Sequence, residues 1–218
     1  DARAVADRLR EAGFRVTLKV DAPRRELQDA IRGFGDALAR DNKAVGVFYY
    51  AGHGVQLNWR NFMLPVDARI QRPADIAAQG VDVGLLLESL ARARNPLNLV
   101  ILDACRNNPF GRDFRTDERG LSQLDAPPGT LLAYATAPGN TADDGEGAHG
   151  LYTDNLLKEM KVPGAPVEDV FKRVRLAVRR ASEGAQIPWE STSLEGDFAF
   201  VGGSGRDLSR EQKEFEAD

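Results

Sequence analysis

The chain has 218 residues, 42% of them apolar and 28% charged, which suits a single domain with a sizeable core. Its formal net charge of −4 argues against a general nucleic-acid binder, since such proteins usually present a basic face. The single cysteine excludes an internal disulfide, and no apolar run approaches the roughly 18 residues of a membrane span. We expect a cytoplasmic protein that binds neither nucleic acid nor membrane; the abrupt start in a helix leaves a periplasmic or secreted protein as an alternative.

In chain order, helical and strand-like patterns alternate. Apolar residues at helical spacing predict helices at residues 1–14, 25–40, 83–94, 150–160 and 167–181. Alternating or continuous apolar runs predict strands at residues 16–20, 44–52, 97–104, 130–136 and 196–201. The middle three runs are typical of strands buried on both faces. The fold class expected is α/β: a three-layer α/β/α domain with a mostly parallel central sheet.

Three stretches lack a regular pattern, at residues 106–128, 137–150 and 184–194. The first two follow buried strands, at the carboxyl ends where open α/β sheets place their sites. We expect one domain over residues 1–202. We expect residues 203–218 to be a charged tail or linker.

One histidine and the cysteine each follow a buried strand. The second predicted strand, at residues 44–52, leads into FYYAGHG, which contains His53, and the third, at residues 97–104, leads into LDACRNN, which contains Cys105. If these strands are neighbours, both residues emerge at one edge of the sheet. A thiol needs such a partner, because at neutral pH it is mostly protonated.

The residues beside this pair suit the same chemistry. Gly52 and Gly54 leave room for a substrate backbone, and the N–H groups of Gly54 and Cys105 are candidate oxyanion donors. A lone cysteine at a strand end is more often a small buried apolar residue, and a histidine between glycines can be a turn residue. What favours a reacting pair is the combination: a strand, GHG, about fifty residues, then a strand ending in an acid-Ala-Cys-Arg run.

On these motifs the chain resembles the caspase-like peptidases, most closely the bacterial members related to metacaspases and paracaspases. The resemblance runs from residue 1 to about residue 201 and includes YYAGHGVQ, NFMLPVDA, LVILDACRNNPF, LLAYATAPGNTADDGEG, YTDNLL and QIPWESTSLEGDF. It implies a caspase-like fold and a cysteine endopeptidase whose catalytic dyad is His53 and Cys105, with a protein or peptide substrate. We interpret the other histidine, His149, as a surface residue.

The resemblance also implies the substrate class. Asp103, two residues before the cysteine, stands where metacaspases and paracaspases that cleave after basic residues have an acid. Asp1 and Asp144 match the paracaspase-like pattern for the same pocket, with Asp143 adjacent. Carboxylates suit arginine, and lysine as a second choice. Each acid has a structural alternative: a helix N-cap for Asp1, loop turns for Asp143 and Asp144, and the loop backbone for Asp103.

The sequence offers no pattern for a metal site, and it offers an arginine-rich loop for processing. The segment between the two catalytic strands has scattered acids, Asp67, Asp75 and Asp82, rather than a calcium-binding cluster, so we expect no metal and no cofactor. Possible self-cleavage sites are Arg112, Arg115 and Arg119, although a solvated charged loop explains them equally well.

The resemblance also implies a strand that this sequence does not contain. Family members have a strand before the first helix; its absence here predicts an open sheet edge, covered by a missing N-terminal segment that stays bound as a partner or by another element.

Two rival interpretations of the function are open. The domain could also be a catalytically silent binding or assembly module of a longer protein. A flavodoxin-like nucleotide binder is disfavoured, because no Gly-rich phosphate loop follows a strand.

Overall fold

A six-stranded sheet forms the centre of the computed structural model, which describes residues 1–41, 43–105, 121–137 and 149–202. The strands stand in the order β3-β2-β1-β4-β5-β6. Their bounds are β1 Val45–Leu57, β2 Arg60–Met63, β3 Val81–Asp82, β4 Leu97–Cys105, β5 Thr130–Tyr134 and β6 Trp189–Thr192. The central strands β1, β4 and β5 are parallel, whereas β2, β3 and β6 pair antiparallel with their neighbours. The predicted α/β class with a mostly parallel centre is confirmed.

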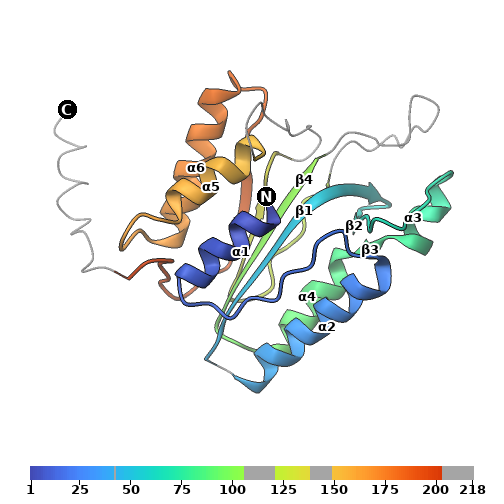
Figure 1. The fold of residues 1–218 in the computed structure, drawn as a ribbon, viewed down its shortest axis with the longest axis horizontal. Helices are drawn as coiled ribbons and strands as arrows, with labels where there is room; N and C mark the ends of the chain where they lie inside the picture. The colour runs from blue at the N-terminus through green and yellow to red at the C-terminus, as the bar shows by residue number, and fades with distance from the viewer. Residues whose placement is uncertain (42, 106–120, 138–148, 203–218) are drawn as a thin grey trace.

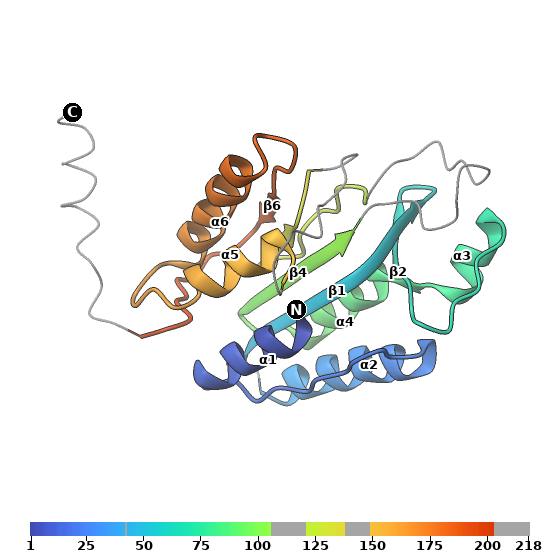
Figure 2. The same ribbon diagram turned by 45° about the horizontal axis from the view of Figure 1, so that its top comes forward.

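Helices cover both faces of this sheet, as Figures 1 and 2 show. They are α1 Ala2–Glu11, α2 Arg24–Arg40, α3 Pro73–Gln79, α4 Val83–Ala93, α5 Leu151–Glu159 and α6 Val167–Ala181. The helices α1, α5 and α6 share one apolar core with the sheet, and α2 and α4 share a second one on the opposite face. The three predicted layers are therefore present. Among the described residues, no helix is both long and apolar enough to cross a bilayer.

The strand β4 explains why continuous apolar runs form the centre of the sheet. Leu99 and Ile101 belong to the core under α1, α5 and α6, whereas Val100 and Leu102 belong to the core over α2 and α4. All four side chains are at most 2% exposed. Because strand side chains alternate between faces, a strand covered on both sides needs apolar residues at every position.

Two predicted strands are wrong. Residues 16–19 alternate in exposure as a strand would, yet residues 16–20 pair with no strand in the described part of the chain. Residues 196–201 are also unpaired; Phe200 is 4% exposed and packs in the core beside α6. A strand requires a neighbour for its ladder of hydrogen bonds, and a local pattern does not supply one. The last strand, β6, instead lies within residues 184–194, where no regular structure was expected.

The segment between β1 and α4 holds more structure than its sequence indicated. Asn58 and Trp59, at φ 51° and 62°, form the two-residue turn between β1 and β2. Both residues at positive φ match the turn type that suits the twist of a hairpin. The short elements α3 and β3 follow before the chain enters α4.

Candidate active site

The backbone pairing of β1 with β4 brings the two predicted catalytic residues together. The parallel ladder begins at Val45 opposite Leu97 and ends at His53 opposite Cys105. These two residues, 52 positions apart in the chain, are therefore register partners at the carboxyl end of the central strands. The condition set by the sequence, that the two strands be neighbours, is met.

His53 does not follow the strand, as predicted, but lies inside it. Up to His53 the strand β1 pairs with β4, and from Gly54, opposite Met63, it pairs with β2. The hairpin with β2 supplies new ladder partners, which is why the strand continues beyond the parallel sheet. His53 is exposed and stands where β1 changes partner.

The backbone of His53 is held by groups that the sequence analysis missed. The hydroxyl of Tyr50 donates to the carbonyl oxygen of His53 at 2.9 Å and lies 3.1 Å from that of Leu64. The N–H of Leu64 donates to the same His53 oxygen at 2.9 Å. Burial raises the pKa of Tyr50 well above its usual value, so its hydroxyl stays a donor. The imidazole therefore projects from a fixed backbone.

The glycines beside His53 have a packing reason that differs from the predicted one. A Cβ on Gly54 would lie 2.9 Å from the Cβ of Ala104, and a Cβ on Gly52 would lie 2.7 Å from the Tyr50 hydroxyl. Both distances are too short for a real side chain. Glycine at position 54 therefore lets β1 lie close to β4, and glycine at position 52 leaves room for the Tyr50 hydroxyl on the same strand. The role of the Gly54 and Cys105 N–H groups toward an oxyanion stays a prediction.

Asp103 lies in a buried group of polar side chains. The residue is 9% exposed, and its Oδ2 atom is 2.5 Å from the hydroxyl of Thr153 and 3.2 Å from that of Tyr49. Burial, and next the charge of Asp103, raise the pKa values of Tyr49 and Tyr152 well above their usual range. Both phenols consequently keep their protons, and the carboxyl group of Asp103 lies near both of them, toward the carboxyl end of β4.

Asp1 lies at the N-cap position of α1, yet its side chain makes no capping hydrogen bond there. Its Oδ1 atom instead accepts from the N–H of Gly150, the residue before α5, at 3.2 Å. The same oxygen is 3.2 Å from Nδ1 of His149, but the two atoms are not aligned for a hydrogen bond. Among the described residues, that nitrogen has no hydrogen-bond partner. Each of these side chains is 28% exposed, so His149 is half-buried rather than the surface residue expected.

Two of the three predicted acids contact residues at the start of α5. Asp1 contacts the residue that precedes α5, and Asp103 contacts Thr153 in its first turn. Other predicted residues lie outside the described part of the chain: Asp143, Asp144, Arg112, Arg115 and Arg119.

The scattered acids between β1 and β4 each serve the local backbone. Asp67 accepts from the first N–H of α2 at 2.8 Å, Asp75 accepts from the backbone at the start of α3, and Asp82 caps α4 at 2.8 Å. In the part of the chain that the structure covers, no three His, Cys, Asp or Glu side chains gather as metal ligands would.

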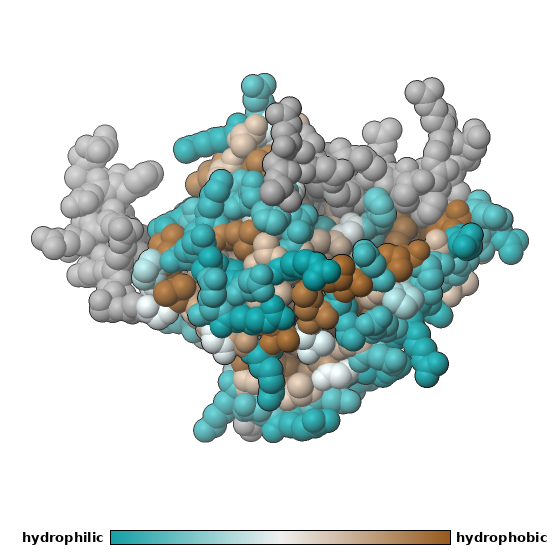
Figure 3. Space-filling model, viewed as in Figure 1, coloured by the Kyte–Doolittle hydropathy of each residue, from teal (hydrophilic) through white to brown (hydrophobic). Residues whose placement is uncertain are grey.

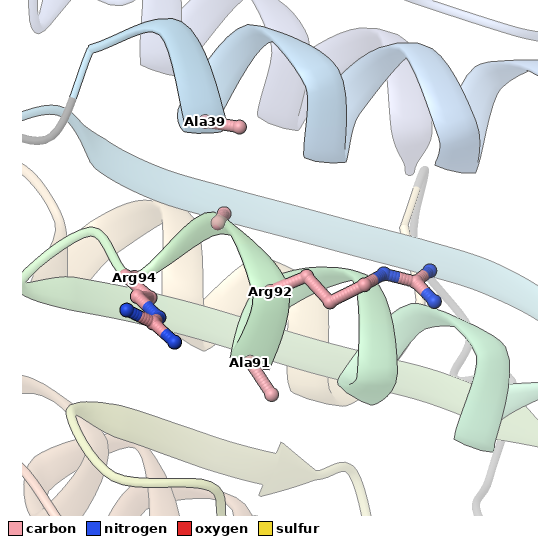
Figure 4. Close-up of a pocket in the computed structure, with 5 residues that line it drawn as sticks. Ala39, Ala91, Arg92 and Arg94 are labelled. Carbon is pink, nitrogen blue, oxygen red and sulfur yellow. The ribbon is translucent and has the colours of Figure 1, made fainter.

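A shallow pocket lies at the other end of the sheet, away from His53. Its lining comes from the ends of α2 and α4, namely Ala39, Ala91, Arg92, Ala93 and Arg94 (Figure 4). These helices end just before β1 and β4 begin, so the pocket is at the amino ends of the strands. Its two arginines point apart in Figure 4, and the pocket has no part in the candidate site.

The sequence analysis also did not identify Tyr49 and Thr153. Tyr49 precedes His53 by four residues in a strand, so the period of two places it on the same face, and that signal was available. Thr153 is 50 residues from Asp103 along the chain, and no local pattern connects them.

The sequence matches known proteins over most of its length. A peptidase family model described as the caspase domain matches residues 1–199. The chain is 28% identical over 170 residues to mucosa-associated lymphoid tissue lymphoma translocation protein 1 of Homo sapiens, and equally to its homolog of Mus musculus. The alignments cover 74% of this chain but 20% and 19% of the relatives. The chain thus spans about a fifth of the length of the curated relatives it matches.

Proposed function

The chain belongs to the caspase-domain family, and on this premise we propose that it is a cysteine endopeptidase that cleaves after arginine, with lysine as a second choice. The main observation behind the proposal is the register of β1 and β4, which pairs His53 with Cys105 at one end of the sheet. A family match alone would leave open whether this chain keeps a reacting pair.

In the proposed mechanism, the Cys105 thiolate attacks the carbonyl carbon of the scissile peptide bond. The carbonyl oxygen becomes an oxyanion, for which the N–H groups of Gly54 and Cys105 are the proposed donors, each worth about 3 kcal/mol in comparable sites. As the C–N bond breaks, His53 gives its proton to the leaving amine. A water molecule, losing a proton to His53, then hydrolyses the thioester and releases the new carboxyl group and the thiol.

Recognition of the basic side chain is assigned to Asp103, Asp1 and Asp144. A guanidinium is planar and always charged, so it pairs well with carboxylates from more than one direction. The shared connection of Asp1 and Asp103 to the start of α5 supports this assignment. Asp144 precedes the same helix in the sequence.

A partner strand is a further part of the proposal. On the side away from β4, residues 45–52 of β1 have no ladder partner among the described residues, and apolar surface crosses this side between α1 and α2 (Figure 3). A strand from a segment of the protein outside the described residues would pair there. Self-cleavage after Arg112, Arg115 or Arg119 is proposed as an activity of the same site.

Peptide turnover tests the main proposal. A fluorogenic peptide ending in arginine should be cleaved, and the same peptide ending in aspartate should not. The Cys105→Ala variant should lose all activity, because the chain has no other cysteine. Turnover that survives this substitution would refute the assignment.

A silent binding or assembly module is the second candidate. It is favoured by the small share of its longer relatives that the chain covers. An arginine-based chloromethylketone separates the two candidates, because stoichiometric modification of Cys105 requires a working nucleophile. No labelling at high reagent concentration would favour the module.

A further inference from the structure

Three side chains from three different elements meet beneath the candidate site. Tyr49 comes from β1, Asp103 from β4 and Thr153 from the first turn of α5. Thr153 is fully buried and Asp103 is 9% exposed. The two hydroxyl oxygens are 2.5 Å apart, Thr153 is 2.5 Å from Oδ2 of Asp103, and Tyr49 is 3.2 Å from that atom.

Counting protons orders these contacts. With Asp103 ionised, as the proposed recognition of a basic side chain requires, its carboxylate only accepts hydrogen bonds, and the three close approaches share two hydroxyl protons. If both hydroxyls donated to Asp103, their own 2.5 Å contact would have no proton and would be repulsive. The arrangement that satisfies the two shortest distances is a chain: Tyr49 donates to Thr153, and Thr153 donates to Asp103. Each donor in such a chain strengthens the next bond.

The surroundings favour this order. Tyr49 stays protonated because its pKa is raised, first by burial and second by the charge of Asp103. Its hydroxyl is therefore the first donor in this chain of hydrogen bonds. Thr153 sits on a helix whose preceding residue, Gly150, also contacts Asp1. This chain of hydrogen bonds therefore fixes the Asp103 carboxylate relative to both β1 and α5.

We propose that Thr153, supported by Tyr49, is a positioning residue that sets the direction of the Asp103 carboxylate for the basic side chain of the substrate. This inference rests on the proposed function and adds residues to it. Thr153 acts on Asp103 directly and Tyr49 acts through Thr153, so loss of the threonine hydroxyl has the larger effect. Neither residue is assigned a contact with the reacting atoms.

The experiment compares Thr153→Val, Thr153→Ser and Tyr49→Phe with the unchanged chain on an arginine peptide. Valine keeps the shape of threonine and removes its hydroxyl, and we expect KM to rise about tenfold with kcat changed less, as loss of a charge-assisted hydrogen bond implies. Serine keeps the hydroxyl and should restore KM to near its original value. Tyr49→Phe should raise KM only about threefold, because Thr153 still donates.

Thr130→Val is the matched control. Thr130 is fully buried at the start of β5, and its hydroxyl has no hydrogen-bond partner among the described residues. The control should leave KM unchanged. Alkylation of Cys105 by iodoacetamide, a small neutral reagent, reports on the reacting pair without the substrate's basic side chain. Its rate should not change in Thr153→Val if that residue acts only on Asp103.

The outcomes separate this inference from the proposed function. If the unchanged chain cleaves the peptide and Thr153→Val has the same KM, the positioning role is wrong and the peptidase assignment stands. If Thr153→Val slows iodoacetamide as strongly as it weakens peptide cleavage, or if serine fails to rescue KM, the effect is structural and the inference is overturned. Absence of cleavage by the unchanged chain overturns the proposed function itself.

Discussion

The sheet has a buried polar group at each end, and the two differ in charge. At the amino end of β4, Asn95 and Asn98 exchange hydrogen bonds of 2.8 and 3.1 Å, and Asn95 also donates to backbone carbonyls. At the carboxyl end, two hydroxyls from Tyr49 and Thr153 surround the carboxylate of Asp103. The amide pair is neutral and ties the strand starts together, whereas the second group places a carboxyl group near the candidate pair His53 and Cys105.

On the proposed function, this difference distinguishes a structural polar group from one that recognises the substrate. Buried amides that bond to each other and to nearby carbonyls satisfy themselves without a ligand. A buried carboxylate is costly to desolvate, and it is retained where its charge has a use. Both groups are hydrogen-bonded, so hydrogen bonding alone does not distinguish them.

Replacing the charged member should have the largest effect. Asp103→Asn keeps the shape of the side chain but removes the charge, so kcat/KM for an arginine peptide should fall about 100-fold. Iodoacetamide should still modify Cys105 at the original rate, because the reacting pair is intact. Unchanged kcat/KM for the arginine peptide would remove Asp103 from substrate recognition.

Tyr50→Phe should have an intermediate effect. The substitution removes the hydroxyl that donates to the His53 carbonyl at 2.9 Å, which leaves the backbone of His53 less well held. We expect kcat to fall about fivefold with KM nearly constant, since the Tyr50 ring lies on the other face from Asp103. Steady-state kinetics measure both values. A rise in KM at constant kcat would contradict this role.

Asn98→Ala should leave catalysis unchanged and affect only stability. Asn98 is 2% exposed, and its loss leaves part of the Asn95 amide unpaired, at a cost of about 2 kcal/mol in the free energy of unfolding. Urea unfolding measures that cost, and kcat/KM per folded molecule should match the unchanged chain. If instead kcat/KM fell as far as in Asp103→Asn, the contrast between the two ends of the sheet would be lost.

The sequence predicted what depends on local pattern. Buried apolar runs identified β1, β4 and β5, and the motifs at their ends identified His53 and Cys105, whose strands are indeed neighbours. Tyr49 could have been added, because the period of two in a strand puts it on the face of His53.

What the sequence did not predict depends on partners distant in the chain. Residues 16–20 have the alternation of a strand but lack a described neighbour, whereas β6 forms because β5 offers an edge. Thr153 meets Asp103 only because α5 packs on the sheet, and Asp1 turns to Gly150 rather than capping its own helix. Such contacts are fixed by tertiary packing, which no local pattern encodes.

The central claim, that His53 and Cys105 form one reacting pair, is tested most directly by alkylation of the cysteine. The chain has a single cysteine, so iodoacetamide incorporation followed by mass spectrometry reports on Cys105 alone. At about pH 6.5 a free thiol reacts slowly, because little thiolate is present, whereas a thiol paired with an imidazole reacts faster. The His53→Ala variant should react on the order of tenfold more slowly than the unchanged chain. Equal rates in the two folded proteins would contradict the account.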